Sequence, residues 1–125
     1  MDPQMINMIA ASSVGFLSIY FAKAGEAAAK KIGEDIYQTL KKHFNNKPAA
    51  KEASVDLEDS PNNPDYQAAL RVQLKKLLTE DEELVKELQQ ILSQAEKTEA
   101  GSVVIQQTAG DNAKQFGQVF GDVNF

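Results

Sequence analysis

The stretch that decides the fold is PQMINMIAASSVGFLSIYFA, residues 3–22, which contains no charged side chain. A helix rises about 1.5 Å per residue, so this stretch is long enough to cross a hydrocarbon layer of about 30 Å. Its Asn, Ser and Gly residues weaken membrane insertion and favour a helix buried in a soluble bundle. The two interpretations are compatible if the helix is buried at rest and inserts on activation.

If the segment acts on a membrane, its large apolar side chains do so. We expect the membrane-active residues to be Met5, Ile6, Ile9, Val14, Phe16, Leu17, Ile19 and Phe21.

Residues 23–44 have the pattern of an amphipathic helix. Ile32, Ile36 and Leu40 recur at every fourth position, which places them on one face. The lysines of this segment lie outside that stripe. Such a basic face either is simply solvated or meets an anionic membrane surface, and the pattern leaves both interpretations open.

Three more helices are predicted before residue 99. A short helix spans roughly 48–58, and the run Ser60–Pro64 breaks the chain. A leucine-rich helix follows over 65–78. The next helix is expected to begin at a capping box formed by Thr79 and Glu82. The sequence therefore predicts an all-α fold for residues 1–98, a small bundle of four to five helices.

The composition changes near residue 101. From Ser102 onward the chain reads SVVIQQTAGDNAKQFGQVFGDVNF, with no Leu or Glu, and residues 103–105 favour a strand. Shifted by eleven positions, Gln107, Gly110 and Asp111 align with Gln118, Gly121 and Asp122. This repeat predicts two strand-forming units that each turn at Gly-Asp.

Two such strands are marginal in water by themselves, whereas identical chains stacked in register give every backbone group a partner. We therefore expect a β-forming, amyloid-type tail over residues 99–125 that assembles with copies of its own kind instead of docking onto the helices. The alternative is a C-terminal tail without structure.

The bulk composition excludes several functions. The chain of 125 residues has a net charge of −5 and no cysteine, which excludes disulfide scaffolds and thiolate metal sites. The acidic balance argues against nucleic acid as a partner. No nucleophile set, metal-ligand cluster or phosphate loop is recognisable, so we expect neither an enzyme nor a cofactor or metal. The single histidine, His43, is expected at the surface near the end of a helix.

Both parts of the chain resemble known families. The tail segment GDNAKQFGQVFGDVNF resembles the bacterial amyloid signalling motifs, which are similar in logic to fungal prion-forming tails and to the animal necroptosis motif. The Gln–Gly spacing departs from the necroptosis motif, so no subtype is assigned. Residues 1–98 resemble the Bell domains, which are likened to the fungal HeLo domain. The resemblance is carried by the uncharged first helix, by GEDIYQTLKKHF and by NPDYQAALRVQLKKLLTEDEELVKELQQIL.

These resemblances imply an effector of regulated cell death in abortive defence. A NOD-like receptor, a STAND NTPase with a matching N-terminal motif, would template the tail into amyloid, and the helical domain would then attack membrane lipids. The protein would be cytoplasmic at rest and at the inner face of the cell membrane when activated. The implied amyloid core consists of Val104, Ile105, Gln106, Gly110, Asn112, Gln115, Gly117, Val119, Gly121, Val123 and Phe125. The competing function is a non-toxic adaptor that clusters a partner through the tail.

Overall fold

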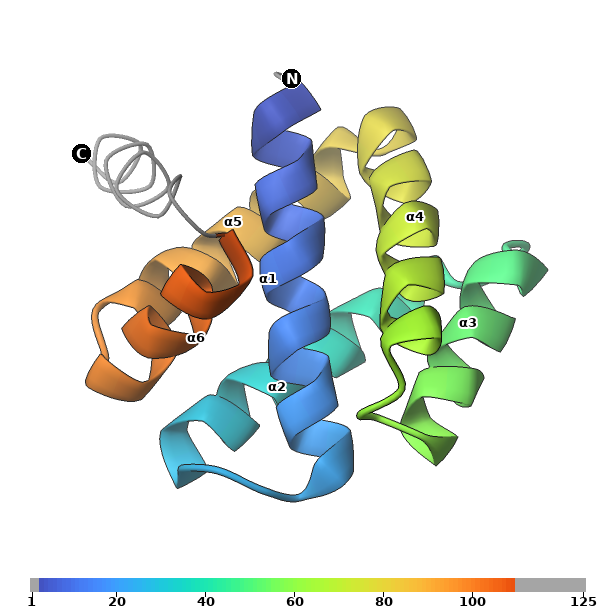
Figure 1. The fold of residues 1–125 in the computed structure, drawn as a ribbon. Helices are drawn as coiled ribbons and strands as arrows, with labels where there is room; N and C mark the ends of the chain where they lie inside the picture. Colours follow the sequence, from blue (N-terminus) through green and yellow to red (C-terminus); the bar gives the residue numbers. More distant parts are fainter. Residues whose placement is uncertain (1–2, 110–125) are drawn as a thin grey trace.

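The computed structural model describes residues 3–109, and these residues form helices and no strand (Figure 1). The helices are α1 (Pro3–Ala22), α2 (Ala27–His43), α3 (Pro48–Asp59), α4 (Pro64–Glu80), α5 (Glu82–Glu96) and α6 (Glu99–Ala109). The all-α prediction is confirmed for the described part of the chain. Helices α1–α5 correspond to the bundle predicted within residues 1–98, and α6 is an additional helix.

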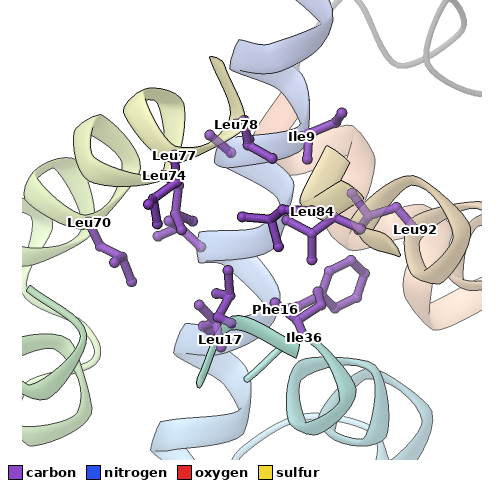
Figure 2. Close-up of a cluster of buried hydrophobic side chains, with 14 of the residues drawn as sticks. Ile9, Phe16, Leu17, Ile36, Leu70, Leu74, Leu77, Leu78, Leu84 and Leu92 are labelled. Carbon is purple, nitrogen blue, oxygen red and sulfur yellow. The ribbon is translucent and has the colours of Figure 1, made fainter. Parts of the chain in front are cut away.

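Helix α1 is the central element of the bundle. It packs against each of the other helices, and Figure 1 shows α3 and α4 on one side of it and α6 on the other. Its Ile9, Phe16 and Leu17 have no or almost no exposed surface. Figure 2 shows Phe16 beside Ile36 of α2 with Leu84 of α5 close by, whereas Leu17 lies to their left, nearer the leucines of α4. The uncharged stretch is therefore helical because its apolar residues form the middle of the core.

A glycine allows α2 to approach α1 closely. A Cβ atom at position 33 would overlap the backbone carbonyl oxygen of Phe16 and the Cβ of Tyr20. Gly33 is buried, and the amphipathic stripe of Ile32, Ile36 and Leu40 continues on both sides of it. The glycine therefore serves close packing of the two helices.

Side-chain caps fix where α4 and α5 begin. The Asn63 Oδ1 accepts hydrogen bonds from the backbone N–H groups of Asp65 (2.9 Å) and Tyr66 (3.3 Å). The Asp81 Oδ1 accepts from the backbone N–H of Leu84 at 3.1 Å, which makes Asp81 the N-cap of α5. Each cap satisfies N–H groups that have no partner inside the helix.

The predicted capping box at Thr79 and Glu82 is wrong. Helix α4 continues to Glu80, and the Thr79 hydroxyl donates to the Lys75 carbonyl at 2.7 Å. Thr79 is thus inside α4, and Asp81 is the residue whose extended backbone separates the two helices. A carboxylate is the stronger N-cap, so the sequence EDEEL starts the helix at its aspartate.

Residues 103–105, whose sequence favours a strand, lie in α6 in this structure, and their strand in an assembled tail stays a prediction. Thr98 stabilises the start of α6. Its Oγ1 accepts from the Gly101 backbone N–H at 2.9 Å and donates to the Ala95 carbonyl at 2.8 Å. Val104 and Ile105 are then 7% and 1% exposed in the core. Packing of these β-branched residues therefore overrides their strand preference, which depends strongly on context.

The start of the predicted tail is accordingly docked onto the bundle, contrary to the expectation that the tail stays apart from the helices. The later part of the predicted amyloid core lies outside the described residues. It comprises Gly110, Asn112, Gln115, Gly117, Val119, Gly121, Val123 and Phe125.

Candidate functional site

The candidate site is α1 together with the helix that covers it. Among residues 3–109, α1 is the helix that is long and apolar enough to cross a membrane, judged by length and composition. Of the residues predicted to be membrane-active, six are buried: Met5, Ile6, Ile9, Val14, Phe16 and Leu17. Ile19 and Phe21 are partly buried against the same core. In this structure the apolar surface of α1 is therefore held away from water by the bundle.

The outer side of α1 is small and polar. Gln4 and Asn7 are exposed, and Ala11 and Gly15 are partly exposed. These positions are three or four residues apart, so they form one narrow strip along the helix. The bundle thus encloses most of the large apolar side chains of α1, and solvent reaches this strip and the partly buried residues of the last turn.

Three serines of α1 are buried among the apolar side chains. Ser12 and Ser13 have no exposed surface, and Ser18 is nearly buried. The Ser18 hydroxyl donates to the Val14 carbonyl at 2.9 Å and accepts from the Gln67 Nε2 at 3.3 Å. The Ser13 Oγ has no hydrogen-bond partner within the described residues. A buried hydroxyl without a partner costs about 1–3 kcal/mol, so α1 is not optimised for the core alone.

Helix α6 covers α1. It packs most extensively on α1 and then on α5 and α2 (Figure 1). Val104 and Ile105 supply the buried side chains of this contact. Both residues, and Gln106 in the same helix, belong to the amyloid core predicted from the sequence. Their place in an assembled core stays a prediction, but in this structure Val104 and Ile105 are core residues.

The backbones of α6 and of the last turn of α5 lie close together at Gly101. A Cβ atom at position 101 would overlap the Ala95 carbonyl group and the Thr98 Oγ1. Gly101 is also the residue whose N–H reaches the Thr98 hydroxyl. Gly101, which lies within the predicted tail, is therefore a packing residue at the start of α6.

The family of the chain follows from a comparison of its whole length. Residues 1–124 match the family model of the Het-E N-terminal domain. The chain belongs to this family. The Het-E N-terminal domain family is associated with cell-death effector function, and the match is consistent with the resemblance to Bell and HeLo-like domains. No curated protein and no solved structure matches the chain.

His43 joins two helices of this Het-E N-terminal domain; it lies at the end of α2 as expected, but its side chain is partly buried instead of lying freely at the surface. Its Nδ1 lies 2.9 Å from Oδ2 of Asp81, and its Nε2 lies 3.7 Å from Oε2 of Glu87. The imidazole is only 16% exposed. The contact links the C-terminal end of α2 to the start of α5. No local pattern predicts it, because 38 positions separate His43 from Asp81.

The electrostatics of this junction support the α5 cap. The backbone N–H of Leu84 and, to a smaller extent, the His43 side chain lower the pKa of the Asp81 carboxyl from its ordinary value of 3.8. Asp81 therefore stays ionised at neutral pH, where it caps the helix and binds His43. Residues 3–109 contain no group of three or more His, Asp or Glu side chains placed to hold a metal ion.

Proposed function

We propose that this Het-E N-terminal domain is a cell-death effector that disrupts a membrane with α1 once the segment after α6 is templated into amyloid. Three points support the proposal: the family is associated with cell-death effectors, α1 has the length and composition of a membrane span, and α1 is stored in the core. The observation that carries it is that α6 packs on α1 and is continuous with the predicted amyloid segment.

The two states of α6 exclude one another. In the resting domain Val104 and Ile105 are buried side chains of a helix. In a cross-β stack the same residues would be extended, at about 3.3 Å per residue instead of about 1.5 Å, and paired with other copies. Assembly that reaches residue 104 therefore withdraws α6 from α1. The apolar side of α1 then loses part of its cover.

The partners follow from this scheme. A NOD-like receptor that carries a matching motif supplies the template, copies of the same chain extend the stack, and membrane lipids accept α1. The protein is then cytoplasmic before templating and at the inner face of the cell membrane afterwards. The buried serines suit a helix that changes environment, since Ser18 already bonds its hydroxyl to the Val14 carbonyl of its own helix.

Seeded dye release from vesicles tests the proposal. The full chain is mixed with dye-filled vesicles of phosphatidylcholine and phosphatidylglycerol, with or without fibrils of a peptide spanning Gly101–Phe125. We expect release only with fibrils. Ala11→Lys should abolish release while the resting domain stays folded, because Ala11 lies on the open strip of α1. A lysine near the centre of a membrane helix costs about 2.5–3.5 kcal/mol.

Ala28→Lys is the matched control. Ala28 is an exposed residue of α2, so the same substitution there leaves α1 unchanged. Far-ultraviolet circular dichroism confirms that both variants retain their helices. Removing residues 1–22 is not a useful test, because α1 is the centre of the core. Fibril-dependent clustering without dye release from the wild-type chain would contradict the proposal and favour the adaptor.

A further inference from the structure

One end of the bundle gathers lysines that lack acidic partners. Lys23 lies in the turn between α1 and α2, Lys30 and Lys41 lie on α2, and Lys51 lies on α3. Within residues 3–109 none of these four ammonium groups forms an ion pair. Residues 1–47 contain six lysines and four acidic residues, although the whole chain has a net charge of −5. Lys23 and Lys30 thus lie beside the last turn of α1, and Lys41 and Lys51 lie around an adjoining hollow between α2 and α3.

Two hollows open between these lysines and share Tyr37 as a common wall. The first, of about 440 Å³, lies between α2 and α3 and is lined by Lys41, Lys47 and Lys51 with no acidic residue. The second, of about 530 Å³, lies at the α1–α2 turn and is lined by Lys23, Lys30 and Lys31 together with Glu34 and Glu58. Lys31 is neutralised there by Glu34 (3.5 Å) and Asp35 (3.0 Å).

Aromatic rings lie between the two hollows. The ring centroids of Tyr20, Phe21 and Tyr37 lie 5.1–5.9 Å apart, and each ring is only partly buried. The Lys41 ammonium lies 5.1 Å above the Tyr37 ring. Val55, which is 54% exposed, continues the apolar surface beside Tyr37. Tyrosine rings, which carry a polar hydroxyl, flanked by lysines on flexible stems are a combination that proteins place at the level of lipid headgroups.

We propose that this face, formed by Lys23, Lys30, Lys41 and Lys51 around Tyr20, Phe21 and Tyr37, docks the resting domain onto an anionic phospholipid surface. The hollows admit lipid headgroups to the lysines, and the rings contact the boundary between headgroups and acyl chains. Charge complementarity favours an anionic membrane as the ligand of this face, because its unpaired lysines would contact a surface that anionic lipids make negative. The inference rests on the proposed membrane action and adds to it a recognition step that precedes templating.

The location of the face has a consequence for α1. Docking holds the C-terminal end of α1 at the membrane, while Pro3 lies at the opposite end of the same helix (Figure 1). The lysines that follow α1 favour staying on the side from which the protein approaches. The N-terminal end of α1 is therefore the end that crosses when α6 is withdrawn.

Vesicle co-sedimentation of the full chain without fibrils tests the docking face. We expect binding to vesicles of phosphatidylcholine with phosphatidylglycerol, weakening with added salt, and no binding to phosphatidylcholine alone. The triple variant Lys23→Gln, Lys30→Gln, Lys51→Gln should lose roughly a hundredfold in affinity, since each lysine near such a surface contributes about fivefold. The matched control Lys75→Gln, Lys86→Gln, Lys97→Gln removes the same charge from exposed positions elsewhere and should bind as the wild type does.

A fluorescent reporter identifies the face directly. The chain has no tryptophan, so Val55→Trp and Val103→Trp each give a single emitter at exposed positions on α3 and α6. These helices lie on opposite sides of α1 (Figure 1). With anionic vesicles the emission of Val55→Trp should shift to the blue, and that of Val103→Trp should not.

Three results would overturn the docking face. The first is an equal loss of vesicle affinity in the two triple variants, and the second is an equal emission shift of the two reporters. The third is no vesicle binding by the folded chain, which would favour an acidic protein as the partner of these lysines. Docking is measured without fibrils and dye release with them, so the two proposals fail separately. Release without docking overturns only the docking face, and docking without release overturns only the proposed function.

Discussion

The first and last helices of the described chain are both partly apolar, yet they are helical for different reasons. Helix α1 contacts every other helix and supplies much of the core with its own side chains. Helix α6 has a strand-favouring sequence and is held by the Thr98 cap, by the close approach at Gly101 and by two buried side chains. We therefore expect α1 to be needed for the whole bundle, and α6 to be needed mainly to cover α1.

The largest effect expected from this comparison is at Phe16. Phe16→Ala removes a ring with no exposed surface from the middle of the core and should lower the free energy of unfolding by about 3–5 kcal/mol. Thermal denaturation should show the whole domain melting earlier. Ile105→Ala is the contrast in α6, where the loss should appear first as faster amide exchange confined to that helix. Equal global destabilisation by both would contradict the distinction.

A substitution at Gly101 should separate the cover from the bundle. Gly101→Ala forces a Cβ atom into the Ala95 carbonyl, and overpacking of this kind costs about 1–3 kcal/mol. We expect lost amide protection in α6, a nearly unchanged melting temperature for α1–α5, and dye release from vesicles without fibrils. Ala24→Ser, at an exposed position of the α1–α2 turn, is a mild control. A variant whose α6 remains protected would show that the close approach is not needed.

A smaller effect is expected at the junction that supports α5. Asp81→Ala removes the N-cap and should destabilise the domain by about 1 kcal/mol at neutral pH. Because folding lowers the pKa of Asp81, its contribution is complete above its ordinary value of 3.8 and is lost as the pH falls through the lower, folded value. Urea unfolding at several pH values measures this. Asp81→Asn retains an oxygen that can cap α5. It should therefore affect the pH dependence of the stability more than the stability at neutral pH.

The smallest expected effect is an increase in the stability of the domain. Ser13→Ala removes a buried hydroxyl that has no partner in the described residues and should stabilise the domain by about 1 kcal/mol. Ser12→Ala is the control, because the Ser12 side chain has a partner and should not give this gain. Urea denaturation compares the two. A loss of stability in Ser13→Ala would mean that its hydroxyl is satisfied in solution, and α1 would then be a better core helix than the structure indicates.

Much of the candidate site was predictable because its signals are local. A run of twenty uncharged residues and leucines spaced by three or four specify helices wherever they are placed. The His43 contact with Asp81 and the close approach of Gly33 to Phe16 were not predictable. Each contact depends on which helices become neighbours, and no local sequence pattern specifies that arrangement.

By itself, the sequence determined that α1–α5 are helices and that α1 is apolar enough for either a core or a membrane, since periodicity and composition fix these properties. Only the tertiary structure decided the state of residues 99–109. Their β-branched side chains favour a strand in isolation, but a buried site on α1 and a cap at Thr98 stabilise the helix. A segment whose local preference opposes its packed conformation is held by its neighbours, and we expect it to change conformation when copies of its own kind offer more favourable contacts.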